Sequence, residues 1–184
     1  MKKYLWILFI FIIIGVCILV FNNNDNNGES YTAERTSLNN KNVIEDNEVN
    51  KGDEGNKEIA QFSTRLPKDT EARDNNIKLA CKTINGVIVN SGEVFSFWDN
   101  LGCTTKENGY KKAKTFTSDG KVTQSYGGGV CQISTTIYNA VLKVKGLDVK
   151  ERHEHSREVT YIEDGKDAAV SYGSADFKFK NNLE

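Results

Sequence analysis

The stretch GGGVCQISTTIYNAVLKVKG, residues 127–146, joins a glycine-rich turn to an amphipathic helix. Apolar residues recur at helical spacing after Cys131, which predicts a helix over residues 131–145 that stops at Gly146. The apolar stripe of this helix consists of Ile133, Ile137, Ala140, Val141 and Val144. Cys131 lies off the stripe, on the mostly polar side that also carries Tyr138. The sequence therefore places a thiol in the first turn of a helix, directly after a flexible turn.

A thiol at the start of a helix is a candidate nucleophile. The free N–H groups and the positive end of the helix dipole favour a thiolate over a thiol. Backbone N–H groups around Val130 to Gln132 would also stabilise a developing oxyanion. We therefore predict that Cys131 is catalytic and that the substrate is bound by its neighbours Gly127, Gly128, Gly129, Gln132, Ser134 and Tyr138. A buried structural cysteine, a disulfide and a metal ligand are the alternatives for Cys131.

A nucleophilic cysteine needs a base, and the two histidines of the chain both lie in the run ERHEHS. If this run is a strand, His153 and His155 point to the same, less charged face, whereas Arg152 points the other way. Either imidazole would take the proton of the thiol, and we favour His155. Asp167 or Asp176 would orient the imidazole, as the third member of such an arrangement does. A half-buried strand position without a part in the chemistry is the alternative for His153.

A zinc site is the competing chemistry, because Cys131 and the two histidines would supply three ligands. No Cys-x-x-Cys or His-Glu-x-x-His spacing supports zinc, and no Gly-Lys-Ser/Thr follows the glycines, as a phosphate-binding loop requires. We predict no metal and no cofactor. The formal net charge is -1 and no basic patch contains interleaved aromatic residues, which argues against nucleic acid as a partner.

The N-terminal residues predict attachment to the cell membrane. Residues 4–21 are almost wholly apolar and follow two lysines, which favours a single-pass anchor over residues 1–21 with its N-terminus in the cytoplasm. No Ala-x-Ala pattern follows, so a cleaved signal peptide is the less favoured alternative. Residues 22–57 are rich in Asn, Asp, Glu and Lys and predict a disordered polar linker. Residues 58–184 are long enough for one globular domain, which we expect outside the membrane.

The pattern of the domain predicts an α+β fold in which helices pack on a mainly antiparallel sheet. A helix is predicted over residues 71–84, and an irregular stretch precedes the glycine turn. Strands are predicted over residues 87–89, 94–97, 147–151, 157–162, 168–172 and 176–179. Cys81 and Cys103 are compatible with a disulfide, which would persist outside the membrane, and equally with two reduced thiols.

Several short motifs lie in a characteristic order and spacing over residues 58–182. They are Gln61–Thr64, Gly92–Phe97, Gly109-Tyr110, Gly127–Thr136, Glu151–Ser156, Gly165–Ala168, Tyr172-Gly173 and Asp176–Phe179. With these motifs the chain resembles the VanW domain family. The resemblance implies an envelope protein of Gram-positive type, and some members of the family are regarded as L,D-transpeptidases whose nucleophile is the cysteine of the glycine motif. It would make Cys131 the acylating thiolate and His155 or His153 its partner.

The residues and the resemblance together predict a membrane-anchored, extracytoplasmic cell-wall protein. We expect a cysteine-dependent L,D-transpeptidase that forms a thioester with peptidoglycan stem peptides. One alternative is a thiol hydrolase of peptidoglycan, which would use the same residues but admit water to the thioester. The other is a non-catalytic wall-binding or accessory module linked to glycopeptide resistance, in which Cys131 only packs.

Overall fold

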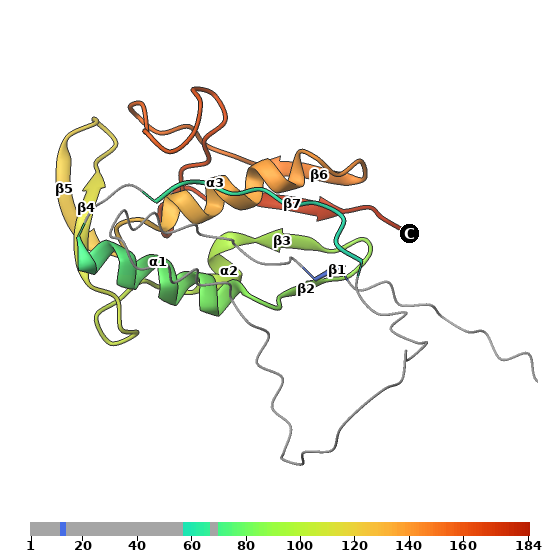
Figure 1. The fold of residues 1–184 in the computed structure, drawn as a ribbon, viewed down its shortest axis with the longest axis horizontal. Helices are drawn as coiled ribbons and strands as arrows, with labels where there is room; N and C mark the ends of the chain where they lie inside the picture. The colour runs from blue at the N-terminus through green and yellow to red at the C-terminus, as the bar shows by residue number, and fades with distance from the viewer. Residues whose placement is uncertain (1–11, 14–56, 67–69) are drawn as a thin grey trace, which may run out of the picture.

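The structure is a computed structural model that describes residues 12–13, 57–66 and 70–184 (Figure 1). The predicted membrane anchor and polar linker lie outside the described residues, except for Ile12–Ile13 and Lys57. Within the described ranges, no helix combines the length and the apolar character that a membrane span requires.

Each helix in the described part of the chain is followed by two short strands (Figure 1). The helices are α1 (Glu71–Ile84), α2 (Phe97–Leu101) and α3 (Val130–Val141). The strands are β1 (Ile12–Ile13), β2 (Ile88–Val89), β3 (Val94–Ser96), β4 (Lys112–Phe116), β5 (Val122–Tyr126), β6 (Leu147–Glu151) and β7 (Lys178–Asn181). In this part of the chain the strands pair antiparallel in three small sheets, with the orders β1-β2, β3-β7-β6 and β4-β5. The predicted α+β class is confirmed, although the sheet is divided into small units.

The core lies where α1 and α3 meet the sheet β3-β7-β6. Phe95 of β3 lies opposite Phe179 of β7, and their rings stack with centroids 5.0 Å apart. Ile77 of α1 and Ile133 of α3 are fully buried in the same core. In Figure 1, α3 runs alongside β6 and β7 after the three glycines that follow β5. This packing fixes the N-terminal end of α3, and with it the position of Cys131.

The helix that begins at the glycine turn is shorter than predicted. The predicted helix over residues 71–84 is confirmed by α1, but α3 ends at Val141 and not at residue 145. The N–H groups of Lys143 and Val144 donate to the carbonyls three residues earlier, which is the tighter pattern typical of helix ends. The predicted irregular stretch before the glycines contains the hairpin β4-β5.

The prediction of strands over residues 157–162 and 168–172 is wrong, because this part of the chain consists of turns and isolated bridges. Polar side chains of α3 take the place of a neighbouring strand. Ala168 N donates to Thr135 Oγ1 at 2.9 Å, and Ala168 O accepts from Ser134 Oγ at 2.6 Å. Asn139 Nδ2 donates to the backbone oxygen of Lys166 at 2.7 Å. The loop is therefore fastened to a helix, a pairing that strand periodicity cannot reveal.

The two remaining cysteines of the domain are not joined. Cys81 and Cys103 are both thiols in the structure. Of the two alternatives for this pair, the structure therefore contains the reduced thiols and not the disulfide. Cys81 packs against the hydrophobic core from α1. Cys131 is a thiol as well and is partly buried.

Candidate active site

The three glycines before α3 allow a close approach to neighbouring elements. A Cβ atom at Gly128 would lie 2.6 Å from the backbone oxygen of Ala113 in β4, and one at Gly127 would lie 2.5 Å from the side chain of Thr104. Gly129 has φ +112°, a conformation that side chains disfavour, and is the N-cap of α3. The glycines thus fix the start of the helix by packing. Their predicted contact with substrate stays a prediction.

The side chains near Cys131 on α3 contact other parts of the protein. Gln132 is fully buried, where its Oε1 accepts from Arg73 Nη2 at 2.8 Å and its Nε2 donates to Thr64 Oγ1 at 3.0 Å. Tyr138 packs edge-on against Phe177 with ring centroids 5.7 Å apart. Ser134, as described above, holds the loop at Ala168. These three residues were predicted to bind substrate, and in the structure their side chains contact other parts of the protein.

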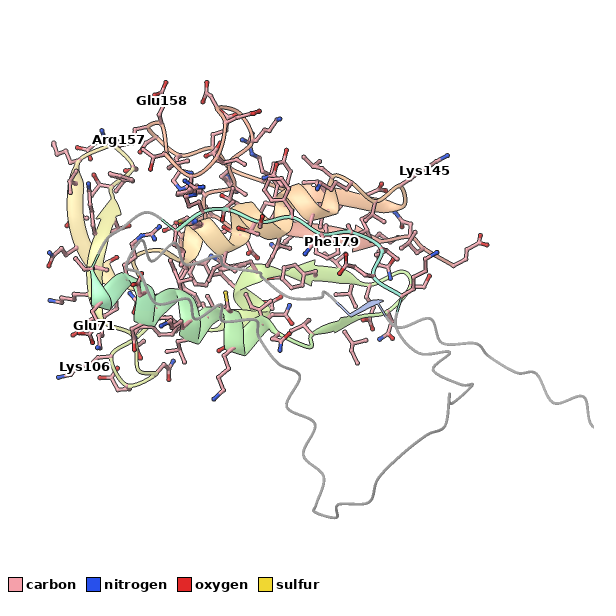
Figure 2. All side chains as sticks on the ribbon, viewed as in Figure 1. Glu71, Lys106, Lys145, Arg157, Glu158 and Phe179 are labelled. Atoms are coloured by element: carbon pink, nitrogen blue, oxygen red, sulfur yellow. The ribbon has the colours of Figure 1, made fainter. Side chains whose placement is uncertain are left out.

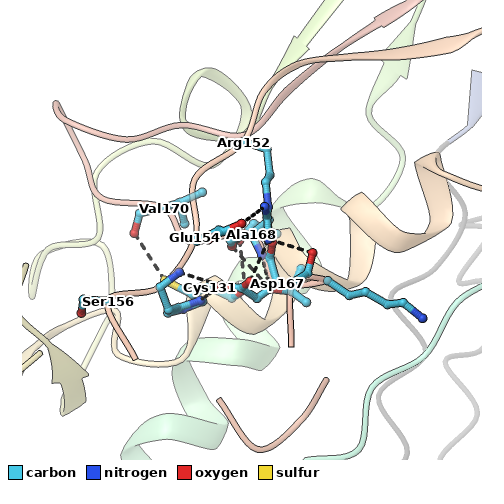
Figure 3. A network of polar contacts seen from close by, with 12 residues as sticks. Cys131, Arg152, Glu154, Ser156, Asp167, Ala168 and Val170 are labelled. Atoms are coloured by element: carbon cyan, nitrogen blue, oxygen red, sulfur yellow. Dashed lines mark hydrogen bonds and ion pairs between the residues drawn. The ribbon is translucent and has the colours of Figure 1, made fainter. Parts of the chain in front are cut away.

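The structure brings Cys131 together with His155 and Asp167. Cys131 Sγ donates a hydrogen bond of 3.3 Å to the backbone oxygen of Val170 (Figure 3). His155 Nδ1 lies 2.5 Å from Asp167 Oδ2, and both side chains are about nine-tenths buried, with 10% and 9% exposed. An ionised carboxylate only accepts hydrogen bonds, so Nδ1 carries the proton and Nε2 is left for the thiol.

Asp167 is held as a carboxylate by several donors (Figure 3). Its Oδ2 also accepts from the backbone N–H of His155 at 2.6 Å, and its Oδ1 accepts from Arg152 Nη2 at 2.8 Å. Burial acts to raise the pKa of Asp167, but the hydrogen bonds from His155 and the charges of His155 and Arg152 outweigh burial and lower the pKa. The imidazole therefore faces a fixed negative charge.

Cys131 and Asp167 both change the pKa of the His155 imidazole. Burial acts to lower the pKa of His155, whereas the hydrogen bond with Cys131 and the negative charge that Cys131 carries when ionised, followed by the same two effects of Asp167, raise the pKa above its ordinary value. An imidazole with a raised pKa beside a thiol can accept the proton of that thiol and later return it to a leaving group. The arrangement can therefore supply a nucleophile and a proton donor at one point.

Tyr161 is a member of the site that was not predicted. Its Oη lies 3.4 Å from His155 Nε2, and the two rings meet edge-on with centroids 6.4 Å apart. Burial, with the charge that the nearby Cys131 carries when ionised adding to it, raises the pKa of Tyr161 well above its usual range. The hydroxyl therefore keeps its proton and can donate a hydrogen bond beside the thiol. The sequence offered one signal, because the alternation that points His155 inward gives Tyr161 the same direction.

His153 and Asp176 lie away from the thiol. His153 Nε2 lies 2.9 Å from Glu151 Oε1, and its side chain is 43% exposed. The hydrogen bond from Lys178, with further bonds from His153 and Asp176 N, lowers the pKa of Glu151 to about 2. Asp176 accepts from Ser96 Oγ at 2.6 Å and from Trp98 N at 3.2 Å, at the start of α2. The side chain of His153 is therefore paired with Glu151 in the structure.

The two histidine side chains have different neighbours because strand β6 ends before both residues. β6 stops at Glu151, and beyond it His153 makes only an isolated bridge to Ala169. A regular alternation of faces requires a continuous strand. For the same reason Arg152, expected on the outer face, turns inward and donates from Nε to Asp167 O at 2.6 Å. The expectation that both imidazoles share one face is therefore wrong.

Two of the backbone N–H groups that were expected to bind an oxyanion already donate to other backbone oxygens. Val130 N donates to Gly127 O at 3.1 Å, and Gln132 N donates to Gly129 O at 3.0 Å. Within the described residues, the N–H of Cys131 makes no such backbone bond outside the helix. The Cys131 N–H is therefore the donor of this group that remains for a ligand.

A cavity of about 400 Å³ opens beside the His155–Asp167 pair. The segment from Glu154 to Asp164 forms most of its wall. Arg157 and Glu158 are among the residues that line the cavity, and they lie at the edge of the molecule in Figure 2. The Arg157 guanidinium lies 4.9 Å from the ring centre of Phe116 in β4. The cavity is large enough for a peptide segment to approach the imidazole.

Comparisons with known proteins match the same region. A family model described as VanW like protein matches residues 72–184. The chain is 38% identical over 124 residues to the uncharacterized protein YoaR of Bacillus subtilis (strain 168), a match that covers 67% of this chain and 40% of that protein. It is 36% identical over 117 residues to the vancomycin B-type resistance protein VanW of Enterococcus faecalis (strain ATCC 700802 / V583), covering 59% of this chain and 41% of that protein. No solved structure matches this chain.

The chain spans about two fifths of the length of these curated relatives, at 40% and 41%. The family match includes α3 and each member of the cluster formed by Cys131, His155 and Asp167. It covers more than half of the chain, from Ala72 to Glu184. This chain therefore belongs to the family of VanW like proteins.

Proposed function

We propose that the domain is a cysteine-dependent acyltransferase of the L,D-transpeptidase type that acts on peptidoglycan stem peptides outside the cell membrane. The observation that carries this proposal is the cluster of Cys131, His155 and Asp167, in which the imidazole is tied to a carboxylate and faces a thiol at a helix start. The relative named for vancomycin resistance supports a substrate in the cell wall, because vancomycin acts on peptidoglycan.

Acylation begins when the Cys131 thiolate attacks the carbonyl carbon of the third residue of a tetrapeptide stem. The protonated Nε2 of His155 gives its proton to the nitrogen of the terminal D-Ala as the C–N bond breaks. D-Ala leaves as a free amine and the stem stays on Sγ as a thioester. Asp167 keeps Nδ1 protonated and the ring in place through both states.

We assign two donors to the carbonyl oxygen as it gains negative charge. One is the Cys131 N–H, at the positive end of the α3 dipole. The other is the Tyr161 hydroxyl, 3.4 Å from His155 Nε2. Donors fixed in advance stabilise a tetrahedral intermediate more than the planar ground state.

The thioester is resolved by an amine from a neighbouring stem. The amine nitrogen attacks the thioester carbon, Nε2 of His155 takes its proton, and Cys131 leaves as a thiolate. One amide bond is broken and another is formed, so the exchange needs no external source of energy. Water in place of the amine would turn the same residues into a hydrolase.

The test is adduct formation by the full-length chain with a tetrapeptide stem or a carbapenem, followed by intact-mass spectrometry. We expect a covalent adduct at Cys131 that Cys131→Ala abolishes, since alanine removes the sulfur at little cost in volume. New cross-links among the muropeptides would support the transferase, and shortened stems alone would support the hydrolase. A folded protein without any adduct would leave the wall-binding module as the better account.

Residues 4–21 are proposed to anchor the protein in the membrane with the domain outside. The apolar run after Lys2 and Lys3 supports this proposal. Membrane fractionation and protease access from outside the cell would test it. A mature protein that begins near Asn22 would identify the segment as a signal peptide.

A further inference from the structure

A tight turn beside the candidate site presents an exposed aromatic ring. Ser171 and Ala175 exchange two backbone hydrogen bonds of 2.8 Å, and Ser174 N donates to Ser171 O at 3.0 Å. Tyr172 lies within this closed turn and is 58% exposed. The motif Tyr172-Gly173 has no part in the chemistry proposed above. Its geometry calls for a separate explanation.

The ring of Tyr172 is held by a second aromatic residue. Trp98 meets it edge-on, with ring centroids 5.4 Å apart and planes at 87°. Trp98 is itself fixed, because its Nε1 donates to Ala175 O at 2.8 Å and its backbone N–H donates to Asp176 Oδ1. The two rings thus form a rigid surface, which loses little conformational entropy when a ligand binds.

The aromatic surface lies close to the thiol along the chain. Val170 O accepts the hydrogen bond from Cys131 Sγ, and Tyr172 is two residues further on. Two residues span at most about 7 Å, to which the tyrosine side chain adds its own length. The third residue of a stem is separated from its sugar by two residues and a lactyl group, on the order of 10 Å. The distance from the thiol to the Tyr172 ring is therefore of the same order as the distance from the third stem residue to its sugar.

We propose that Tyr172 and Trp98 bind a sugar ring of the peptidoglycan glycan strand, so that the stem attached to that strand reaches Cys131. This inference rests on the proposed function and adds the glycan to its substrate. A pyranose ring presents C–H groups on one face, and these pack against the electron-rich face of an aromatic ring. The turn SYGSA carries no charge and offers hydroxyl groups for the edge of an uncharged sugar.

The surroundings favour a sugar over a protein as the occupant. The other large apolar side chains that are exposed in the described ranges are Ile59, Ile88, Val94, Val122 and Leu142. None of them belongs to the turn, where Tyr172 is the exposed large apolar side chain. A stable protein interface buries about 800 Å² on each partner, far more than two rings provide.

The test measures binding of a stem-free glycan oligosaccharide, prepared by removing the stems from peptidoglycan. In the full-length chain with Trp6→Phe, Trp98 is the one remaining tryptophan, so its emission reports on the turn. We expect a saturable change in emission, a roughly tenfold or greater loss of affinity in Tyr172→Ala, and retained affinity in Tyr172→Phe. Val94→Ala, an exposed position on β3, is the matched control and should bind like the parent protein. Co-sedimentation with insoluble stem-free glycan gives a measure that does not depend on Trp98.

Equal binding by Tyr172→Ala and the parent protein, or no binding of the glycan by either method, would overturn the inference. Acylation of the parent protein by a carbapenem and by a stem that still carries its sugar is measured in parallel. Acylation without glycan binding would refute the glycan site and leave the proposed function standing. Glycan binding without acylation would support the aromatic site and refute the enzyme.

Discussion

Replacing Asp167 by asparagine tests the electrostatic core of the site. Oδ2 of Asp167 accepts from Nδ1 and N of His155 at 2.5 and 2.6 Å, and Oδ1 accepts from Arg152 Nη2 at 2.8 Å. Asparagine has nearly the same shape but carries an NH₂ donor in place of one oxygen. Whichever way the amide turns, this donor faces an N–H group of His155 or of Arg152. Asp167→Asn therefore removes the negative charge and at least one of the three bonds.

The expected size of the effect follows from the bond to the imidazolium. A hydrogen bond that involves a charged group contributes about 1.5–3 kcal/mol. Loss of that contribution in the transition state would slow acylation about 10- to 150-fold, at 1.36 kcal/mol for each factor of ten. The partly buried Arg152 loses the more buried of its two carboxylate partners and keeps Glu154, so we expect the free energy of unfolding to fall by about the same 1.5–3 kcal/mol.

The assay is the rate at which a carbapenem modifies Cys131, followed by intact mass, with thermal melting as the measure of folding. Asp164→Asn is the matched control, since Asp164 is exposed and lines the same cavity three residues away. It should react at the wild-type rate. A folded Asp167→Asn that also reacts at the wild-type rate would refute the orienting role of the carboxylate.

The remaining predictions concern the base, the oxyanion, the pH dependence and the glycine turn. His155→Ala should slow adduct formation far more than His153→Ala, because His153 lies against Glu151; the reverse order would assign the base to His153. Tyr161→Phe should slow acylation by about 100-fold if the hydroxyl donates to the oxyanion, as measured by the same mass assay, and an unchanged rate would remove Tyr161 from the mechanism. The pKa of His155 is raised in the folded protein, so its protonation stabilises the fold below the unfolded pKa of about 6.5, and this contribution is lost as the pH rises through the folded pKa. In urea unfolding between about pH 6 and 9, the stability difference between wild type and His155→Gln should therefore shrink with rising pH, and a constant difference would contradict the raised pKa. Gly128→Ala should cost about 1–3 kcal/mol in melting experiments, because its Cβ would lie 2.6 Å from Ala113 O, and an unchanged melting temperature would show that the turn can relax.

Local patterns in the sequence predicted the elements that depend on local interactions. The apolar spacing over residues 71–84 identifies α1 with its bounds, and the glycine run identifies the start of α3. The chain has only two histidines, so few residues can serve as the base of a thiol nucleophile. The sequence could therefore name Cys131 with either histidine and with Asp167 or Asp176, and the structure places Cys131, His155 and Asp167 together.

Contacts between distant segments could not be predicted in the same way. The inward turn of Arg152 and the separation of His153 from His155 both follow from the end of β6 at Glu151, and a period-two pattern assumes that the strand continues. The loop around Ala168 was read as a strand because its backbone bonds to side chains of α3 leave no trace in the alternation of residues. Tyr161 was missed for a related reason, since its place beside His155 depends on the path of that loop.

The polar side of α3 explains how the site is held together. A helix with one apolar stripe is expected to turn its polar side to solvent, yet Ser134 and Thr135 are fully buried and Asn139 nearly so. Their side chains bond to the backbone of Lys166 and Ala168, on either side of Asp167. The helix that carries the nucleophile therefore also positions the carboxylate that orients the base. Helix α3 therefore fixes the positions of both Cys131 and Asp167, the two residues on either side of His155. A single rigid element that holds both residues keeps the site preorganised.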